Sequence, residues 1–275
     1  MMSPELKDND FKKIVRLVYE QCGINLHDGK RELVKARLSK RLREAGFTSF
    51  ADYYRYVVSE YGSYELTSMI DSISTNMTYF FREDGHFQKL RTIIPAMTEE
   101  KGHNGHTPKL RIWTAGCSTG EEPYSLAITL KEHSSKIEAT ILATDISSKV
   151  LKTATNGIYL NEKLKNILPG ILKKYFQYGC GEWAGYYRVK DEIRRMIQFI
   201  KFNLMDPPPP DFIFDIIFCR NVMIYFDKTT QGLLVNRFYN CLKDGGYFFV
   251  GHAESLSGIS HPFKYIEPSV YRKHS

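Results

Sequence analysis

The stretch that decides the fold reads Ile112-Trp113-Thr114-Ala115-Gly116-Cys117-Ser118-Thr119-Gly120-Glu121-Glu122-Pro123-Tyr124-Ser125. It opens as an apolar run typical of a strand, breaks at Gly116, and restarts as a helix after Gly120. Pro123 fits that helix because the N–H groups of a first turn have no intrahelical partner. A strand, a glycine turn and a helix N-terminus form the first unit of a nucleotide-binding α/β sheet.

The acids after the turn indicate which nucleotide-like ligand it suits. Dinucleotide folds bind a pyrophosphate at this helix N-terminus, and Glu121 and Glu122 would repel that group. The same carboxylates suit a ligand with a cationic group, such as the ammonium of an amino acid. The turn therefore favours S-adenosylmethionine over NAD. A plain strand–turn–helix with an acidic cap is the alternative.

The composition is that of an ordinary globular chain. Its 275 residues are 43% hydrophobic and 25% charged, enough for one large domain or two unequal ones. The five cysteines have no metal-binding spacing, so we expect free thiols and a cytoplasmic location. The charged first twenty residues predict no signal peptide, and no apolar run reaches the roughly 18 residues that cross a bilayer. The net charge of +7 favours an acidic partner of unspecified kind.

The pattern changes from helical to alternating along the chain. Helices are expected around residues 11–18, 30–45, 49–60 and 64–76, and a loop at 102–108. From about residue 109, strands alternate with helices, which predicts a parallel sheet with helices on both faces. Glycines between residues 173 and 196 indicate a small antiparallel insertion, and residues 265–272 a last strand that can run antiparallel. The expected strands are Lys109–Cys117, Ala139–Ile146, Ile197–Leu204, Asp215–Arg220 and Tyr247–His252, and the helices between them lie near 121–133, 147–155 and 228–242.

Polar residues at the strand ends define a candidate site, because ligands of open α/β sheets lie at the carboxyl ends of the strands. Asp145 ends the second strand, where a carboxylate can accept hydrogen bonds from both ribose hydroxyls of an adenosyl group. Capping the next helix is the alternative role, which Ser147 can fill instead. Asn203 and Leu204 end the third strand, where they either meet the adenine ring or form an ordinary strand exit.

The fourth strand ends in Arg220 and Asn221. Charged and amide groups at the end of a buried strand are costly unless they face a cleft, which indicates a cleft here. Tyr225 follows within reach of the same cleft, although a tyrosine among apolar neighbours is usually part of the core.

Three more polar residues, Asn76, Thr78 and Arg82, lie where the helical part joins the sheet. Ligand pockets often form at such junctions, so these side chains are candidates for binding. A surface ion pair is the alternative for Arg82, and spacing does not decide between the two.

A basic helix is a further signal. Residues 30–43 hold seven basic side chains and one acid. At about 100° per residue, three apolar residues share one face and three basic residues lie opposite. The apolar residues are Val34, Leu38 and Leu42, and the basic ones are Arg37, Lys40 and Arg43. Solvated faces normally mix charge signs, so we expect this face to dock an acidic partner.

Together these segments resemble the chemotaxis receptor methyltransferase family, the CheR type. The matching blocks follow the family's order and spacing and span nearly the whole chain. Each block alone is weak, but their combination is specific. The blocks are Thr75–Glu83, Ser118–Ser125, Ala143–Ile146, Ile217–Asp227 and Gly251–Leu256.

The resemblance implies a small all-helical receptor-docking domain over residues 1–76 and a Rossmann-like class I methyltransferase domain over residues 77–275. An antiparallel β subdomain is implied within the second domain, at about residues 173–197. The implied reaction transfers a methyl group from S-adenosylmethionine to glutamate side chains of chemoreceptors, giving glutamyl methyl esters and S-adenosylhomocysteine. The implied partners are the cytoplasmic domains of chemoreceptors. We expect a monomer that uses no metal, binds no nucleic acid and inserts into no membrane.

The resemblance also assigns roles to residues. Arg82 and Tyr225 are expected to orient the acceptor and cofactor ends, and Arg37, Lys40 and Arg43 to dock the receptor. Some family members hold a receptor tail peptide on the insertion, here near residues 179–188. The expected cofactor contacts are Asn76, Thr78, Arg82, Glu122, Asp145, Asn203, Leu204, Arg220 and Asn221.

The implied chemistry requires little of the protein. A glutamate with a pKa of about 4.3 is already ionised at neutral pH, so no general base is needed. Two alternatives stay open: a nucleic-acid methyltransferase, and a non-catalytic scaffold that binds the cofactor. The positive charge and Asp206-Pro207-Pro208-Pro209 favour the first, since amino-methylating enzymes use an acid–Pro–Pro–aromatic loop. Against it, the fourth position is proline and the loop follows the third strand rather than the fourth.

Overall fold

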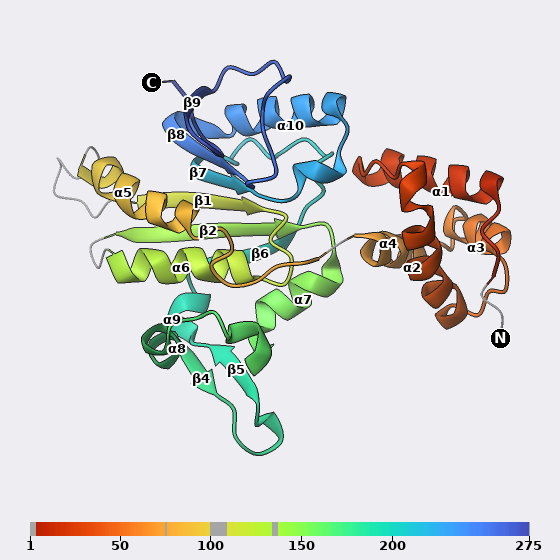
Figure 1. The fold of residues 1–275 in the computed structure, drawn as a ribbon, viewed down its shortest axis with the longest axis horizontal. Helices are drawn as coiled ribbons and strands as arrows, with labels where there is room; N and C mark the ends of the chain where they lie inside the picture. The colour runs from red at the N-terminus through yellow and green to blue at the C-terminus, as the bar shows by residue number, and fades with distance from the viewer. Residues whose placement is uncertain (1–3, 75, 100–108, 134–136, 275) are drawn as a thin grey trace. The chain divides into compact units, whose positions relative to one another are not determined.

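The computed structural model describes residues 4–74, 76–99, 109–133 and 137–274 (Figure 1). The loop expected at residues 102–108 lies outside the described residues. The chain forms two compact units. The helical unit comprises Met1–Thr75 with Tyr225–Gln231, and the sheet unit comprises Asn76–Ile224 with Gly232–Ser275.

The helical unit contains the helices that the sequence predicts. Helix α1 ends at Gly23, which has a φ of +72° and donates its N–H to the Tyr19 carbonyl at 2.8 Å. Ser49 caps the third helix by accepting the Asp52 N–H at 3.1 Å. The elements are α1 (Asp8–Cys22), the 3₁₀ turn η1 (Asp28–Lys30), α2 (Arg31–Glu44), α3 (Phe50–Val57) and α4 (Ser63–Ile73).

The apolar stripe of α2 is confirmed, since Val34, Leu38 and Leu42 are fully buried. Beside it, Arg41 donates to both carboxylate oxygens of the buried Glu65 in α4, with its Nε 2.6 Å from Oε1. Such a two-pronged charged pair is among the stronger hydrogen-bonded contacts, and it fixes α2 against α4.

The opposite face of α2 requires a correction. Lys40 and Arg43 are exposed as expected, but Arg37 is half-buried. Its guanidinium donates to the Ile73 carbonyl, and to the Ser74 carbonyl at 3.1 Å. A cation at a helix C-terminus satisfies carbonyls that have no intrahelical partner, so Arg37 already has a structural role at the end of α4.

The sheet unit is built on a seven-stranded sheet in the order β6-β2-β1-β7-β8-β10-β9. The first five strands are parallel, and β10 runs antiparallel to β8 and β9. Figure 1 shows β8, β7, β1, β2 and β6 one below the other. The expected parallel sheet is therefore confirmed, and the expected last strand is an antiparallel hairpin. The strands are β1 (Lys109–Ala115), β2 (Glu138–Asp145), β6 (Ile197–Lys201), β7 (Phe214–Cys219), β8 (Leu242–Val250), β9 (Lys264–Glu267) and β10 (Val270–Arg272).

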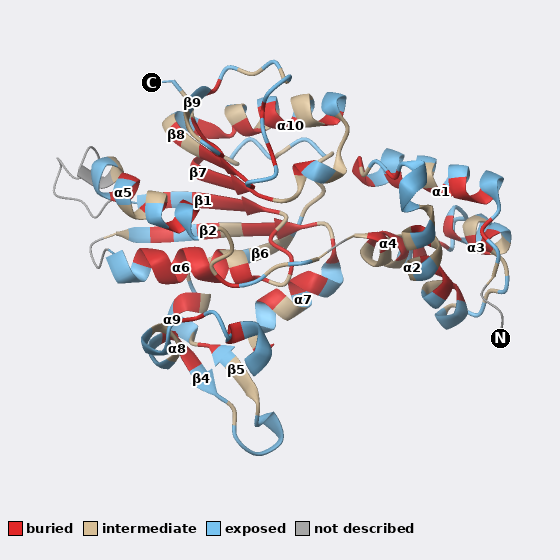
Figure 2. Cartoon of the chain, in the orientation of Figure 1, coloured by how far each residue is buried: buried red, intermediate tan, exposed pale blue. Residues whose placement is uncertain are grey.

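Helices cover both faces of this sheet. On one face, Ile112 and Phe218 belong to the same buried cluster as residues of α5 (Gly85–Glu99) and α6 (Glu121–His133). On the other face, Trp113 packs against Phe238 of α10 (Lys228–Asn240) with ring centroids 5.2 Å apart. Helix α7 (Ser148–Asn156) packs on β2 and β6. Figure 2 shows the central strands and α6 as the most buried elements.

Helix α5 was not predicted. It begins at Gly85 and contains Pro95, and both residues weaken a helical pattern. Tertiary contacts compensate, because Phe87 and Leu90 of this helix are fully buried in the core. Among the described residues, no helix combines the length and apolar character that a membrane span requires.

A second, antiparallel sheet forms the inserted subdomain, in the order β3-β5-β4. Its first strand lies upstream of the expected range of 173–197. The sequence does not predict this strand, because a strand of three residues is too short to show a period. The insertion contacts the glycine turn, since the Tyr159 hydroxyl donates to the Thr119 carbonyl at 2.6 Å. Its elements are β3 (Ile158–Leu160), η3 (Asn161–Leu164), α8 (Pro169–Tyr175), β4 (Phe176–Tyr178), η4 (Gly181–Trp183), β5 (Tyr186–Val189) and α9 (Asp191–Arg194).

Candidate functional site

The glycine turn after β1 folds tightly against the neighbouring strand ends. Gly116 has a φ of +81°, and a Cβ atom there would lie 2.3 Å from the Val222 side chain. The N–H groups of Gly116 and Cys117 both donate to the Thr144 carbonyl, at 2.8 and 2.9 Å. Only glycine fits both the left-handed backbone and the close approach, so the turn depends on this residue.

Asp145, the last residue of β2, fixes the other side of the turn. One carboxylate oxygen accepts the Ser118 N–H at 2.8 Å, and the other accepts the Ser147 N–H at 2.9 Å. The helix-capping role belongs to Ser147, whose hydroxyl accepts the Val150 N–H at 3.3 Å. Asp145 is thus a buried acceptor at the carboxyl end of a parallel strand, where its ribose-binding role stays a prediction.

Arg220, directly after β7, lies between two carboxylates. Its Nη1 donates to Glu122 Oε2 at 2.9 Å, and its Nη2 donates to Glu83 Oε2 at 3.0 Å and to the Arg82 carbonyl. Thr114 Oγ1 donates to the second oxygen of Glu122 at 2.5 Å. The Arg220 side chain is 1% exposed, so its charge is compensated by these acids rather than by water.

The two acids at the start of α6 face different surroundings. Glu122 contacts Arg220, as described. Glu121 is fully buried, where its Oε2 accepts the Thr119 hydroxyl at 2.6 Å and its Oε1 lies 3.6 Å from the Lys163 ammonium. Burial raises the pKa of Glu121 above its usual value despite these partners. Glu121 therefore lies against the insertion and is not placed for a cationic ligand, whereas the expectation that Glu122 suits such a ligand stays a prediction.

Residues 76–83 run beside the glycine turn. The Phe81 N–H donates to Ser125 Oγ at 2.9 Å, and the Ser118 hydroxyl lies 3.4 Å from the Asn76 carbonyl. Arg82 donates to the Met77 carbonyl at 2.8 Å. Its guanidinium carbon lies 5.8 Å from the Tyr79 ring centroid. Arg82 is therefore held by its own segment and remains partly exposed.

Glu83 connects this segment to the ends of β7 and β8. Its carboxylate accepts Arg220 Nη2 at 3.0 Å, Asn221 Nδ2 at 3.3 Å and the His252 N–H at 3.1 Å. Burial acts to raise the pKa of Glu83, but the Arg220 charge and the hydrogen bonds outweigh it, so the pKa lies below its usual value. Sequence reasoning gave Glu83 no role, although it stands directly after Arg82.

Backbone strain concentrates in the segments just described, which are residues 76–83, the glycine turn after β1 and the residues after β7. Of the five non-glycine residues with positive φ among those described, four lie in these segments. Each such conformation costs on the order of 1–3 kcal/mol and persists only where its surroundings hold it. The clustering of these residues supports a binding or catalytic site here. They are Phe81, Glu83, Ser118 and Asn221.

Asn203 and Leu204 follow the end of β6. Asn203 Oδ1 accepts the Met205 N–H at 3.1 Å, and the Leu204 carbonyl accepts Arg237 Nη1 at 2.8 Å. The preceding Phe202 N–H donates to the Asp145 carbonyl at 3.0 Å, which brings this exit beside the end of β2. Both residues therefore lie at the predicted edge, and their contact with adenine stays a prediction.

Tyr225 belongs to the helical unit. Its carbonyl accepts the Asn25 N–H at 2.8 Å, and its side chain is half-buried. Nearby, the Tyr19 hydroxyl donates to Asp227 Oδ2 at 2.8 Å. These contacts anchor the segment after η5 (Met223–Tyr225) to α1 and the residues that follow it. The acceptor-orienting role of Tyr225 stays a prediction.

Three potential metal ligands, Glu83, His86 and His252, also meet at this edge, with their ligand atoms within 4.8 Å of one another. His86 is buried, and its ring nitrogens have no hydrogen-bond partner among the residues that the structure describes. Burial and the nearby Arg220 charge lower the pKa of His86 to about 3. A cation is disfavoured here, because Glu83 already accepts three hydrogen bonds and the Arg220 guanidinium adjoins it.

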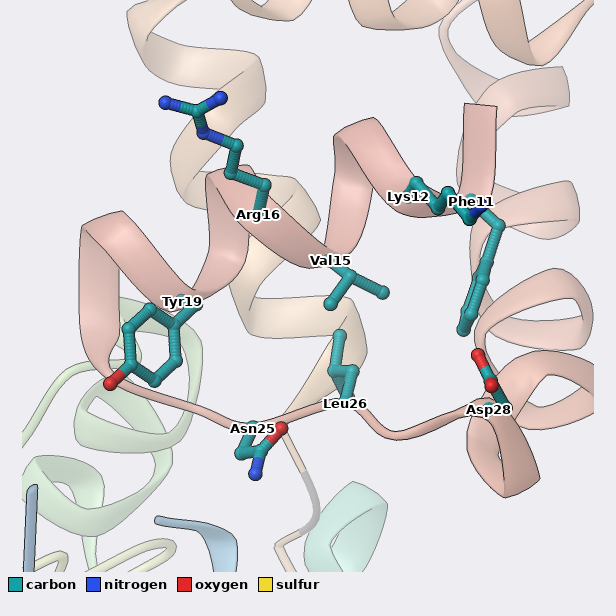
Figure 3. Close-up of a pocket in the computed structure, with 8 residues that line it drawn as sticks. All are labelled: Phe11, Lys12, Val15, Arg16, Tyr19, Asn25, Leu26 and Asp28. Carbon is teal, nitrogen blue, oxygen red and sulfur yellow. The ribbon is translucent and has the colours of Figure 1, made fainter. Parts of the chain in front are cut away.

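A groove of about 280 Å³ lies elsewhere, in the helical unit between α1 and residues 25–28 (Figure 3). Phe11, Val15 and Leu26 give it apolar walls, and Arg16 extends away from them. None of the eight residues labelled in Figure 3 is a predicted cofactor contact, so the groove is separate from the candidate site.

Comparisons with known proteins match both units. A family model described as the CheR methyltransferase all-alpha domain matches residues 9–74, and one described as the CheR methyltransferase SAM binding domain matches residues 76–272. The chain is 42% identical over 272 residues to a chemotaxis protein methyltransferase of Borreliella burgdorferi, covering 96% of this chain and 94% of that protein. It is 40% identical over 272 residues to a chemotaxis protein methyltransferase of Escherichia coli, covering 97% and 91%.

Proposed function

Because the chain belongs to the CheR methyltransferase family, we propose that it methylates glutamate side chains on the cytoplasmic domains of chemoreceptors. It is a methyltransferase that uses S-adenosylmethionine, and the proposed products are a glutamyl methyl ester and S-adenosylhomocysteine. The observation that carries the proposal is the buried Arg220 between Glu122 and Glu83, at the carboxyl edge of the parallel sheet.

The side chains at this edge fit the polar groups of S-adenosylmethionine. Its methionine part carries an ammonium, which suits Glu122, and a carboxylate, which suits Arg220. Its ribose carries two hydroxyls, which suit the Asp145 carboxylate. Asn203 and Leu204, beside Asp145 at the exit of β6, are the proposed adenine contacts. Carboxylates at this edge would repel the pyrophosphate of a dinucleotide, so the donor set favours the same cofactor.

Four further residues complete the proposed cofactor contacts: Asn76, Thr78, Arg82 and Asn221. The Asn76 carbonyl lies next to the Ser118 hydroxyl of the glycine turn. The Asn221 side-chain amide donates to the Glu83 carboxylate. The strained backbone at Asn221 and Ser118 supports a binding role, since such strain concentrates at sites that hold ligands.

The proposed reaction asks for placement rather than proton transfer. When bound, S-adenosylmethionine supplies an electrophilic methyl group on a sulfonium. The acceptor glutamate is ionised at neutral pH, since its pKa is about 4.3, and so no residue has to remove a proton. His86, with a pKa of about 3, is a weak base and fits this requirement. Arg82 and Tyr225 are proposed to orient the acceptor and cofactor ends, and exclusion of water would favour the neutralisation of charge.

The proposed docking surface is the basic face of α2. Lys40 and Arg43 are exposed and offer positive charge to a receptor bundle that bears glutamates. Arg37 is the weakest member of the predicted trio, because its guanidinium already binds the end of α4. The insertion around residues 179–188 is a second proposed contact, for a receptor tail peptide.

The nucleic-acid alternative finds little support. Asp206 is exposed and follows β6, where its N–H donates to the Asn203 carbonyl at 2.9 Å. Arg237 of α10 binds the carbonyls of Leu204 and Met205 and so fixes the start of the proline run. The next sheet strand in the chain, β7, is followed by Arg220 and Asn221 rather than by an acid–Pro–Pro–aromatic loop.

One experiment separates the proposal from both alternatives. The protein is incubated with methyl-labelled S-adenosylmethionine and, in parallel reactions, with a receptor cytoplasmic domain, with duplex DNA or with neither. Label on the receptor that mild alkali releases supports the ester. Label on DNA supports the nucleic-acid alternative, and cofactor binding without label on either acceptor supports the scaffold.

A further inference from the structure

The carboxylate of Glu254 fills a ring of backbone N–H groups from the residues that follow β7 and β8. Its Oε2 accepts the N–H of Asn221 at 2.7 Å and of Gly251 at 2.6 Å, and its Oε1 accepts the N–H of Ile224 at 3.2 Å. The N–H of Met223 contributes to the same cluster. Successive N–H groups around a left-handed residue form a concave anion site, and here the anion comes from the chain itself.

Burial makes the loss of these hydrogen bonds costly. Glu254 is 7% exposed, so its carboxylate depends on these N–H groups rather than on water, and two of the donors, Met223 and Gly251, are themselves buried. Burial raises the pKa of Glu254, while the backbone hydrogen bonds act in the opposite direction. A buried N–H left without an acceptor is costly, so removing one oxygen of this carboxylate would destabilise the turn.

The turn cannot hold its shape without support. Asn221 has a φ of +59°, which is unfavourable for a residue with a side chain. The packing is also tight, because a Cβ atom on Gly251 would lie 2.6 Å from Asn221 Nδ2 and 2.9 Å from Glu254 Oε2. Glu254 therefore stabilises a strained backbone directly after β7, where Arg220 and Asn221 lie.

Two carboxylates bind different parts of the chain at the end of β7. Glu83 binds the side chains of Arg220 and Asn221, whereas Glu254 binds the backbone that follows them. We propose that Glu254 is a positioning residue, which sets the backbone of residues 221–224 so that Arg220 and Asn221 meet the cofactor. This inference rests on the proposed cofactor site. Glu254 would act through Asn221 rather than by contact with the ligand.

A matched pair of variants tests this proposal. Asp215 is another buried carboxylate, near the start of β7, where it accepts the Arg111 N–H at 2.7 Å. Glu254→Gln and Asp215→Asn both replace a carboxylate by an amide of the same shape. We expect the first to weaken S-adenosylmethionine binding at least about fivefold, because a backbone N–H then faces an amide donor. The second should change the Kd by less than about twofold. Equal Kd changes in the two folded variants would overturn the proposal.

A double-mutant cycle tests whether Glu254 acts through Asn221. Asn221→Gly removes the amide while keeping the left-handed backbone allowed. If Glu254 positions Asn221, the double variant should lose little more affinity than the worse single variant. Independent, multiplying losses would contradict the proposal, and so would unchanged affinity in all three variants. Because calorimetry with S-adenosylmethionine needs no acceptor, failure of receptor methylation would leave this test intact.

A second route covers the case in which Glu254→Gln does not fold. Gly251→Ala keeps the Glu254 carboxylate but places a methyl group against Asn221. It should raise the Kd for S-adenosylmethionine at least about fivefold, whereas Gly170→Ala, at a site with open space around it and no left-handed backbone, should not. Normal affinity in Gly251→Ala would show that the position of this turn does not matter for binding.

Discussion

Asp145→Asn is the most informative change at the proposed cofactor site. The carboxylate accepts one N–H on each oxygen, from Ser118 at 2.8 Å and from Ser147 at 2.9 Å. An amide of the same shape has one acceptor oxygen, so one buried N–H would face an NH₂ group. An unpaired buried donor costs about 1–3 kcal/mol in the free energy of unfolding. At roughly 2–4 °C per kcal/mol for a domain of this size, Tm should fall by about 2–12 °C.

The same change should weaken cofactor binding by a separate amount. Loss of a charge-assisted hydrogen bond to a ribose hydroxyl, worth about 1.5–3 kcal/mol, corresponds to roughly tenfold to hundredfold in Kd. Titration calorimetry at a temperature where the variant is folded measures this directly. Ser147→Ala is the control, because it removes the cap of α7 two residues away and should lower Tm without changing the Kd. Equal Kd for wild type and Asp145→Asn would remove Asp145 from the site.

Two further predictions concern docking and pH. The double variant Lys40→Glu, Arg43→Glu should raise the receptor KM and abolish most of its salt dependence. The control variant Lys149→Glu, Lys152→Glu on α7 changes the net charge equally and should have neither effect. Equal effects of the two variants would mean that only net charge matters. Burial lowers the pKa of His86 from 6.5 to about 3, so below pH 6.5 the unfolded chain binds a proton that the folded chain does not. Stability should therefore fall as pH drops from about 6.5 toward 3, by up to about 1.4 kcal/mol per pH unit, and His86→Asn should flatten this slope in denaturant titrations. An unchanged slope would exclude His86 as its source.

The sequence predicts the fold well where periodicity is long. The stripe Val34, Leu38 and Leu42 is buried as expected, and the alternation after residue 109 matches the parallel strands. Helix α5 and strand β3 escape prediction for different reasons. The helix contains Pro95, and the strand has three residues, so neither shows a clear period. Packing in the core, rather than local propensity, stabilises both.

The sequence predicts which residues gather at the strand ends, but not all of their contacts. Strand-end logic finds Asp145, Arg220 and Asn221, because residues after buried strands gather at one edge of a parallel sheet. It does not find Glu83 or Glu254, which lie outside strands and act by hydrogen bonds to residues far away in the chain. Their signal in the sequence is only their position inside blocks that resemble the family. At about 100° per residue, Arg37 lies about 60° from Val34, at the border of the apolar stripe rather than opposite it, which agrees with its half-buried position at the end of α4.

The most direct test of the proposed function locates the transferred methyl group. Receptor cytoplasmic domain is incubated with the protein and S-adenosylmethionine, digested under acidic conditions that preserve esters, and sequenced by tandem mass spectrometry. Methyl esters are expected on glutamate side chains, and they should be lost after mild alkaline treatment and absent when the protein is omitted. Methyl groups on nitrogen or sulfur atoms of the receptor, or no modification while S-adenosylmethionine binding is intact, would contradict the proposed function.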